Sequence, residues 1–195
     1  MTAPDVVTEM FAAYRTSLDS LEGKLGSAFS DAVDLLEGMS GTVVVCGMGK
    51  SGLVGAKITA TLTSTGTPSV FLHPAEAMHG DLGIVRKGDL IILISNSGET
   101  EEITRLLPAL KRLAVRIIAL VGNVDSTMAR AADICLDAAI DKEACPLNLA
   151  PTTSTLAALV LGDALAVALM ERRGFRPADF AATHPGGKLG KKLLH

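Results

Sequence analysis

The chain has little aromatic character: it contains no tryptophan, one tyrosine and five phenylalanines among 195 residues. Because 48% of the residues are nevertheless hydrophobic and the mean hydropathy is +0.38, the core must consist of aliphatic side chains. Small and branched side chains on a buried parallel sheet give this composition. A chain of this length is one domain that can bury a substantial core.

Basic runs are absent, and the net charge of −3 with a pI near 5.8 argues against a nucleic-acid-binding surface. The N-terminal residues lack the basic and apolar regions of a secretion signal, so we expect a cytoplasmic protein. Cysteine is scarce: Cys46, Cys135 and Cys145 are odd in number and have no C-x-x-C spacing. They are typical of reduced thiols, with Cys145 a candidate for contact with the functional site.

Long apolar runs are also missing. The longest candidate extends from Leu156 to Met170 and is interrupted by Asp163. It is too short to span a bilayer, and the aspartate would cost about 2.5–3.5 kcal/mol at the bilayer centre. We therefore expect no membrane contact. A helix that is apolar on all sides is buried in protein, and contacts between subunits would help to bury this one.

Two short loops carry the clearest functional signal. The glycine loop (residues 47–52) follows the apolar run 43–45, and the serine loop (residues 95–100) follows the run 90–94. A loop of glycine and hydroxyl residues between a strand and a helix directs free N–H groups, hydroxyls and the helix dipole at an anion. Only the glycine loop contains a cation, Lys50. This combination favours the phosphate of a small molecule over a nucleoside triphosphate with magnesium.

The glycine loop also matches G-x-G-x-x-G through Gly47, Gly49 and Gly52. A dinucleotide site requires an acidic residue after the next strand, but the strand 69–72 is followed by His73 and Pro74. The phosphate loop of nucleotide hydrolases would require glycine at position 44, which is valine. Both interpretations are therefore disfavoured. A tight turn without a ligand remains the alternative, and the serine loop argues against it.

Strands and helices alternate along the chain, which predicts an α/β fold with a five-stranded parallel sheet and helices on both faces. Residues 1–40 contain two helices, broken near Gly23 and Gly26, and belong to the same domain as residues 41–195. We find no internal repeat. Strands are expected at 43–46, 69–72, 90–94, 116–121 and 134–136, with helices through Leu62, near 75–82, through Leu113, at 126–131, from Thr152 to Arg173 capped by Gly174, and after Pro185-Gly186-Gly187.

Together these features resemble a sugar isomerase (SIS) domain and, more closely, the arabinose-5-phosphate isomerases. The resemblance covers residues 43–194. Its motifs are the glycine and serine loops, Ser64-Thr65-Gly66-Thr67-Pro68, His73-Pro74-Ala75-Glu76-Ala77-Met78-His79-Gly80-Asp81-Leu82-Gly83, Lys142-Glu143-Ala144-Cys145-Pro146-Leu147, Leu149-Ala150-Pro151-Thr152-Thr153-Ser154-Thr155, Met170 and His184-Pro185-Gly186-Gly187.

The resemblance implies a three-layer sandwich with a flavodoxin-like sheet, and reversible conversion of D-ribulose 5-phosphate to D-arabinose 5-phosphate. This reaction supplies Kdo for lipopolysaccharide. It implies no organic cofactor, and a homotetramer whose sites are shared between subunits. Many members continue into a pair of CBS domains, whereas this chain ends at His195. We expect a single-domain form without the CBS pair, either naturally short or shortened from a longer chain, so regulation through CBS domains is in doubt.

An aldose–ketose isomerase moves a proton between C1 and C2 through an enediol and stabilises the charge that develops on oxygen. By resemblance, the catalytic residues are Lys50, His79, Glu102, Glu143 and His184. Each has a plainer interpretation: a first-turn residue for Glu102, a solvated loop residue for Glu143, a helix cap for His79 and a surface residue for His184. We expect His184 and one glutamate to transfer the proton; which of them removes it from C2 stays open.

Small donors make up the rest of the predicted site. Lys50 has two candidate roles, binding the phosphate or stabilising the enediolate, and the run 152–155 could also cap its helix. His73, His79 and Cys145 match no standard metal spacing, so no metal is expected. The candidate substrate-binding residues are Gly49, Ser51, Ser95, Asn96, Ser97, Thr100, Thr153 and Ser154.

Two alternative functions remain at this point. The first is a non-catalytic sugar-phosphate sensor on the same fold. Such sensors usually carry a DNA-binding domain, which we do not find before Val43, and they do not need two glutamates and two histidines. The second is an isomerase of another phosphosugar, such as sedoheptulose 7-phosphate or a hexulose 6-phosphate.

Overall fold

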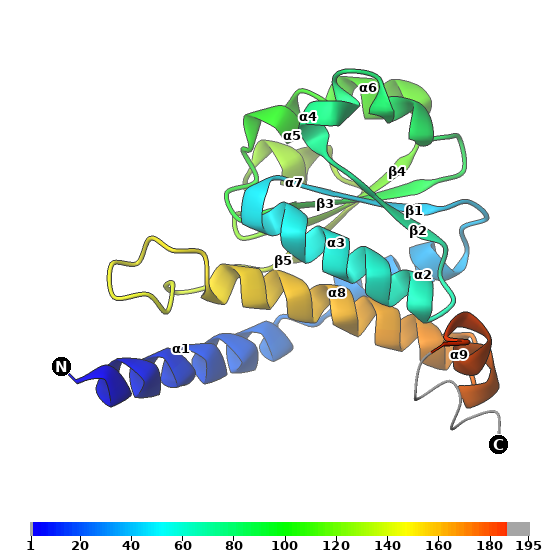
Figure 1. The fold of residues 1–195 in the computed structure, drawn as a ribbon. Coiled ribbons are helices and arrows are strands. Elements are labelled where there is room, and N and C mark those ends of the chain that lie inside the picture. Colours follow the sequence, from blue (N-terminus) through cyan, green and yellow to red (C-terminus); the bar gives the residue numbers. More distant parts are fainter. Residues whose placement is uncertain (1, 187–195) are drawn as a thin grey trace.

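A computed structural model describes residues 2–186 as a single parallel sheet surrounded by helices (Figure 1). The strand order is β2-β1-β3-β4-β5, which is the flavodoxin-like order. This confirms the predicted fold class. The strands are β1 (Val43–Gly47), β2 (Ser69–Leu72), β3 (Leu90–Ser95), β4 (Arg116–Val121) and β5 (Ile134–Asp137).

Alternate side chains of the strands point into two separate cores. In β1, Val43 and Val45 face one core, while Val44 and Cys46 face the other. The first core packs against α2 (Ser27–Glu37), α3 (Gly49–Ser64) and α8 (Thr153–Arg172); the second packs against α5 (Glu101–Thr104), α6 (Leu107–Leu113) and α7 (Thr127–Ala131). The result is the expected three-layer sandwich, because continuous apolar strands are buried on both faces.

The pairing of β1 with β3 brings the two motif loops together. Val43 pairs with Leu90 and Gly47 with Ile94, so the glycine and serine loops leave the sheet side by side. The chain order reverses between these two strands, since β2 lies on one side of β1 and β3 on the other. In open parallel sheets, ligands bind at the carboxyl ends of the strands at such a switch point.

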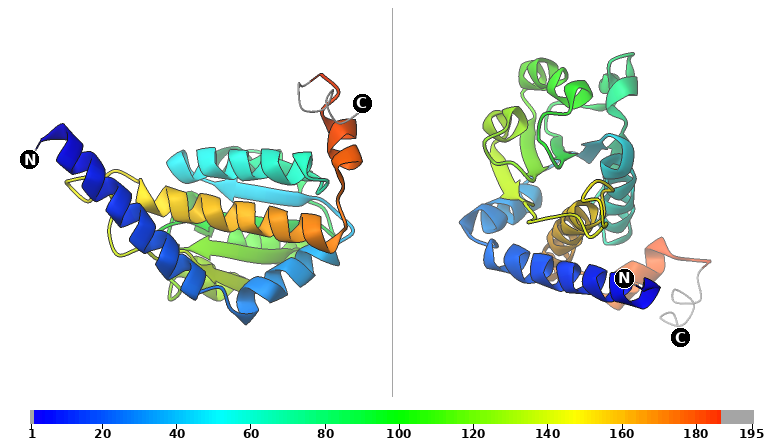
Figure 2. Two further views of the ribbon diagram at one scale, coloured as in Figure 1. Left: turned by 90° about the horizontal axis from the view of Figure 1, so that it is seen from below. Right: turned by 90° about the vertical axis from the view of Figure 1, so that its left-hand side faces the viewer.

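The first helix, α1 (Ala3–Gly23), extends beyond the body of the domain (Figures 1 and 2). Leu21, near its end, is its only buried residue, whereas Val7 and Phe11 in its first half are about half exposed. The two expected N-terminal helices are confirmed, with a break at residues 24–26. The projecting half of α1 leaves apolar side chains without cover in the described part of the subunit.

The expectation that the apolar run is too short to span a bilayer is wrong, because helix α8 has 20 residues and is long and apolar enough to cross a membrane by length and composition alone. In the structure it is instead a core helix of the domain. Leu161, Leu165 and Leu169 are buried in the core beside the sheet, and Asp163 pairs with Lys57 of α3 at 2.6 Å. The charge that interrupts the apolar run therefore contacts a neighbouring helix.

Two details differ from the sequence prediction, and a third lies beyond the described residues. The helix expected through Leu113 is divided into α5 and α6, because Pro108 in the first turn of α6 has no N–H to continue a longer helix. Helix α9 (Pro177–Thr183) is not among the predicted elements. The short helix expected after Gly187 lies outside the described residues. The remaining elements are α4 (Pro74–Ala77) and a 3-10 turn (Asp81–Ile84).

Candidate active site

A cavity of about 530 Å³ lies at the carboxyl ends of β1 and β3, where the switch point predicts a ligand. Its walls come from three segments distant in sequence: the glycine loop, the serine loop and the Glu143 loop (residues 141–152), which leads into α8. Predicted site residues from each segment meet here. The lining residues are Met48, Lys50, Ser51, Asn96, Ile140, Asp141, Lys142, Glu143, Asn148, Leu149, Pro151 and Ser154.

The glycine loop brings the start of α3 to the cavity by a very tight turn. A Cβ on Gly47 would lie 2.8 Å from the carbonyl oxygen of Ser51, so only glycine fits there. Gly49 begins the helix with φ of 56° and is exposed. Lys50 and Ser51 therefore occupy the first turn of a 16-residue helix, where the free N–H groups favour an anion.

The serine loop is held together by its own side chains. Ser95 is 3% exposed, accepts a hydrogen bond from the N–H of Gly98 at 3.1 Å and lies 2.7 Å from the hydroxyl of Thr100. Asn96 and Ser97 are exposed, and Asn96 lines the cavity. Ser95 thus shapes the loop, while its exposed neighbours are the ones that can meet a ligand. Because α5 has only four residues, the anion-binding capacity of this loop lies in its own N–H and hydroxyl donors rather than in a helix dipole.

Glu143 accepts hydrogen bonds at both of its carboxylate oxygens. Oε2 accepts from the N–H of Thr152 at 2.7 Å, its hydroxyl at 3.0 Å and the N–H of Ser154 at 3.2 Å; Oε1 accepts from the hydroxyl of Ser154. Burial raises the pKa of Glu143, but the hydrogen bonds from Ser154 and Thr152 outweigh burial and lower the pKa overall. The carboxylate is therefore ionised at neutral pH.

Two unpaired cations face this carboxylate-containing cavity. Neither Lys50 nor Lys142 forms an ion pair within residues 2–186. An ammonium group that has no carboxylate partner is available to a phosphate or to a developing oxyanion. The arrangement can therefore hold an anionic ligand and stabilise negative charge on it.

Two predicted catalytic residues lie near the strand ends but do not line the cavity. His79 follows α4, is exposed, and donates its backbone N–H to the carbonyl of Glu76 at 2.9 Å. Glu102 lies in the first turn of α5 and is partly buried. Thr153, predicted to bind substrate, is 1% exposed, and its hydroxyl has no partner among the described residues.

His184 lies far from the cavity of its own subunit. It follows α9, and the neighbouring Thr183 donates its hydroxyl to the carbonyl of Ser64 at 3.4 Å, at the end of α3 opposite Lys50. The 14 residue steps from Lys50 to Ser64 separate the two ends of α3 by about 21 Å. His184 Nδ1 lies 2.9 Å from the carbonyl of Phe180. Because a carbonyl only accepts, Nδ1 donates this bond, and Nε2 has no hydrogen-bond partner within residues 2–186.

The sequence reasoning missed several residues of the cavity wall. Asp141, Lys142 and Asn148 supply polar groups there. Asn148 has φ of 53°, and its Oδ1 accepts the backbone N–H of Glu143 at 2.7 Å. An asparagine that follows Pro146-Leu147 is a turn signal, because asparagine tolerates the left-handed conformation. That signal could have placed it in the loop, although not its contact with Glu143.

Cys145 lies in the same loop, beside the site. Its Sγ accepts the backbone N–H groups of Leu149 and Ala150, each at 3.3 Å, and these bonds lower the pKa of the thiol. Burial raises the pKa of Cys46 to about 12, as expected for a core thiol. Cys145 does not line the main cavity, but it helps to shape the loop that does.

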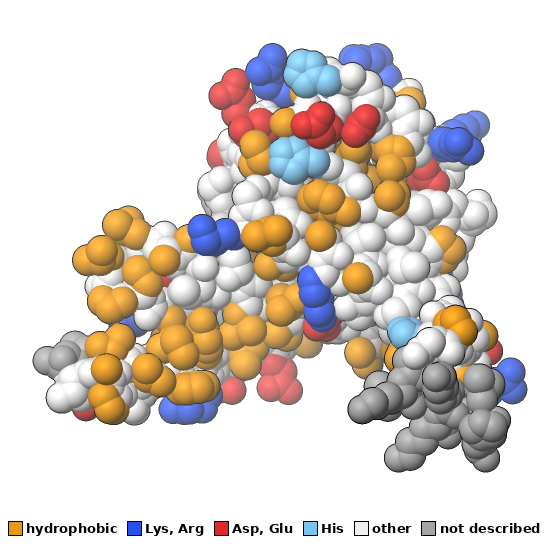
Figure 3. Space-filling view, in the orientation of Figure 1, with side chains coloured by type: hydrophobic (Ala, Val, Ile, Leu, Met, Phe, Trp, Pro, Cys, Tyr) orange, Lys and Arg blue, Asp and Glu red, His pale blue; other side chains and the backbone are white. Residues whose placement is uncertain are grey.

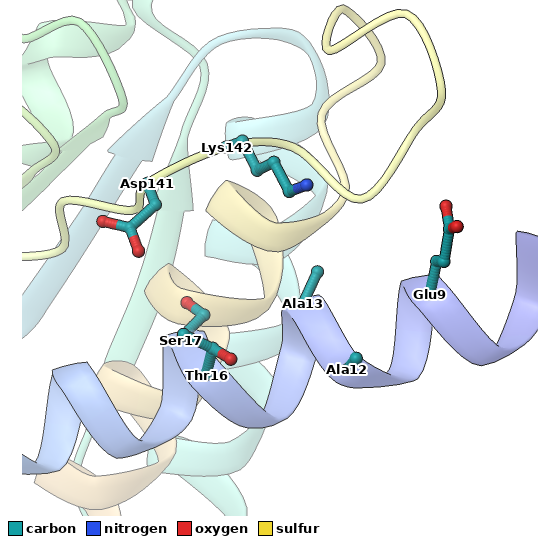
Figure 4. Close-up of a pocket in the computed structure, with 7 residues that line it drawn as sticks. All are labelled: Glu9, Ala12, Ala13, Thr16, Ser17, Asp141 and Lys142. Atoms are coloured by element: carbon teal, nitrogen blue, oxygen red, sulfur yellow. The ribbon is translucent and has the colours of Figure 1, made fainter.

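A second cavity of about 270 Å³ lies behind the Glu143 loop, between this loop and α1. Figure 4 shows Ala13 and Ser17 on the side of α1 that faces Lys142 and Asp141. The last two residues also line the main cavity. The Glu143 loop is therefore a wall between the candidate site and the projecting helix.

Comparison with known proteins agrees with this geometry. The family model for the SIS domain matches residues 39–168, which include the glycine loop, the serine loop and the whole of the Glu143 loop. The chain belongs to the SIS-domain family. The predicted family is thus confirmed.

Curated relatives of this SIS-domain chain are named arabinose 5-phosphate isomerase KdsD. The protein of Pseudomonas aeruginosa is 58% identical over 180 residues, which cover 92% of this chain and 55% of that protein. The protein of Escherichia coli K12 is 56% identical over 186 residues, which cover 95% of this chain and 57% of that protein. The chain thus spans just over half the length of the curated relatives it matches.

Two solved structures share both the fold and a substantial part of the sequence. The protein c3406 of E. coli CFT073, solved in complex with arabinose 5-phosphate, is 40% identical with a TM-score of 0.90, and the match covers 95% of this chain and all of that one. A putative phosphosugar isomerase of Bacteroides fragilis is 38% identical with a TM-score of 0.90, covering 95% of this chain and 99% of that one. The SIS fold of this chain therefore extends over nearly the whole length of both solved chains.

Proposed function

We propose that this SIS-domain protein interconverts D-ribulose 5-phosphate and D-arabinose 5-phosphate through an enediol. One observation carries the proposal: the chain is 56–58% identical to proteins named arabinose 5-phosphate isomerase over at least 92% of its own length. The cavity supports it with a free cation, hydroxyls, an amide and a carboxylate at the switch point of the sheet. The product would feed Kdo and lipopolysaccharide synthesis in the cytoplasm.

The proposed roles follow from the chemistry of an enediol. The exposed donors Asn96 and Ser97, together with Ser51, bind the phosphate and the sugar hydroxyls, because the phosphate needs charge-assisted hydrogen bonds. Lys50 stabilises the negative charge that develops on the substrate oxygen. Proton transfer requires a group whose pKa suits neutral pH, and a histidine fits best. The candidates for the remaining roles are the residues that the family resemblance implies, which are Lys50, His79, Glu102, Glu143 and His184; Glu143 has two candidate roles, to react or to position other residues.

His184 would act in the cavity of a neighbouring subunit. Within one subunit it lies at the far end of α3 from Lys50, too distant to reach the same substrate. Its free Nε2 is nevertheless suited to accept a proton. From this position the imidazole can act only on a substrate that is bound in the cavity of a second copy of the chain.

The exposed apolar surfaces support a homotetramer. Figure 3 shows hydrophobic side chains gathered on the projecting arm, which is formed by α1 and the Glu143 loop. This first surface includes Phe11 and Leu149, the latter 76% exposed. A second set lies on α3 and α8, where Leu53 is 74% exposed and Val167 62% exposed. If each surface packs against its own copy on a neighbouring subunit, the two surfaces give two kinds of two-fold interface, as in a tetramer with dihedral symmetry.

The proposed activity is tested by an assay with five- to seven-carbon phosphosugars on chelator-treated protein. Turnover between ribulose 5-phosphate and arabinose 5-phosphate, faster than on sedoheptulose 7-phosphate or a hexulose 6-phosphate, is the expected result. A folded, oligomeric sample that binds sugar phosphates but converts none of them would instead indicate a sensor.

A further inference from the structure

The Glu143 carboxylate forms the N-terminal cap of α8, although it lies nine residues before Thr152. Thr152 is the residue that precedes the helix, and its own side chain makes no capping hydrogen bond. The free N–H groups of Thr152 and Ser154 are bonded to Glu143 instead. A carboxylate at the N-terminus of a 20-residue helix is also favoured by the helix dipole.

The same bonds close the Glu143 loop on itself. The backbone N–H of Glu143 donates to Asn148, and the backbone N–H of Ala144 donates to the hydroxyl of Thr152 at 2.9 Å. Thr152 in turn donates this hydroxyl to Glu143. The Glu143 carboxylate and the backbone N–H groups of Glu143 and Ala144 thus all form hydrogen bonds across the loop. The position of the loop therefore depends on Glu143.

This arrangement leaves Glu143 poorly suited to exchange a proton with a sugar. Oε2 accepts three hydrogen bonds and Oε1 accepts one. Oε1 keeps one lone pair, but the hydrogen bonds fix its direction and, by keeping the pKa of Glu143 low, reduce its basicity toward a proton on carbon. The contacts that it does make fix the residues around it: Ser154, Asn148 and Lys142 all line the cavity.

We propose that Glu143 is a positioning residue, which holds the Glu143 loop against the start of α8 and so sets the cavity wall, and that it does not transfer the proton. This inference rests on the proposed isomerase function. It leaves Glu102 and His184 as the proton-transfer groups of the candidate set.

Glutamine at position 143 separates the two roles. Its carbonyl oxygen can replace Oε2 and accept from Thr152 and Ser154, while its amide can replace Oε1 and donate to the Ser154 hydroxyl after that hydroxyl rotates. The Glu143→Gln variant therefore keeps the bonds but cannot act as a base. The Glu143→Ala variant loses both.

The experiment compares kcat, KM and the pH profile of both variants, together with amide hydrogen exchange in residues 141–154. We expect Glu143→Gln to lower kcat less than about tenfold, with an unmoved pH profile and protected amides. Glu143→Ala should lose about 10²-fold and exchange rapidly. A general base would instead lose about 10²–10⁴-fold in both variants. Such a loss in Glu143→Gln with the amides still protected overturns the proposal.

Thr152→Val provides an independent test, because it keeps the carboxylate and removes a hydroxyl that Glu143 binds. We expect faster exchange of the loop and a lower kcat with the same pH profile. If Thr152→Val exchanges its loop amides rapidly but keeps an unchanged kcat, the proposal is contradicted. This outcome is informative even if Glu143→Gln fails to hold the loop. Absence of turnover in the unmodified protein would count against the proposed function, while the exchange measurements would still report on the capping contacts.

Discussion

The imidazole of His184 stacks on the ring of Phe180, with centroids 3.8 Å apart and planes inclined by 12°. The same histidine is held by the Phe180 carbonyl at 2.9 Å and lies 3.0 Å from the Thr183 hydroxyl. The end of α9 therefore orients the ring before any second subunit arrives. A histidine that is fixed in this way, and whose Nε2 has no partner among the described residues, is prepared to act on a neighbouring molecule.

Sharing of the site predicts that two inactive variants complement each other. His184→Ala and Lys50→Ala should each lose about 10²–10⁴-fold in kcat/KM, as expected for proton-transfer or charge-stabilising groups. After the subunits exchange, some mixed sites combine an intact Lys50 with an intact His184, and part of the activity returns. Exchange verified by mass spectrometry without any return of activity would place His184 outside the shared site.

The serine loop predicts different consequences for two hydroxyls that lie two residues apart. Ser97 is exposed, so Ser97→Ala should raise KM more than it lowers kcat, because phosphate contacts act equally on ground and transition states. Ser95 is buried and accepts the N–H of Gly98, so Ser95→Ala should lower the melting temperature as well. Steady-state kinetics and thermal unfolding check both variants, and equal melting temperatures would contradict this division.

The contact between α3 and α8 predicts a destabilising small-to-large change. A Cβ on Gly162 would overlap the side chain of Ile58, which is fully buried. Gly162→Ala should cost about 1–3 kcal/mol in urea unfolding, despite the better helix propensity of alanine. Ile58→Ala removes the overlapping atoms. In a double-mutant cycle, the double variant should therefore lose less free energy of unfolding than the sum of the two single losses. If the losses in unfolding free energy of the two single variants simply add, then α3 and α8 move apart at little cost and the predicted overlap is contradicted.

The lowered pKa of Glu143 predicts a pH-dependent contribution to stability. Because the folded-state pKa lies below the ordinary 4.5, the charged form stabilises the protein above that pH, and the contribution disappears as the pH falls through the folded-state value. Compared with Glu143→Gln, the unmodified protein should be more stable by about 1 kcal/mol at pH 7, allowing for solvent screening. Urea unfolding should give a smaller difference at a pH of about 3.5 than at pH 7.

The sequence predicted the sheet well because continuous apolar runs such as 43–46 and 90–94 have few alternatives to buried parallel strands. The break that divides α5 from α6 also has a readable signal, because Pro108 cannot continue a helix, although we expected one helix through Leu113. Helix α9 was missed because it is short. Its start at Pro177 with Asp179 two residues later was a readable signal.

The candidate site was predictable only where loops follow adjacent strands. The glycine and serine loops meet because β1 pairs with β3, and this pairing is part of the flavodoxin-like strand order that the family resemblance implies. It brings together Lys50, Ser51 and Asn96. The bonds of Glu143 to α8 depend on how a loop closes over nine residues, and no local pattern encodes that closure. The distance between His184 and Lys50 likewise depends on where α9 packs.

The proposed isomerase activity is tested most directly by following ribulose 5-phosphate in D₂O by NMR with chelator-treated protein. Proton transfer through an enediol should produce arabinose 5-phosphate and introduce deuterium at C2 of the aldose and C1 of the ketose as the two interconvert. Failure of folded, oligomeric protein to convert any phosphopentose would contradict the proposed function. Interconversion without any deuterium would contradict proton exchange with solvent, and would indicate either a hydride shift or one base that solvent does not reach.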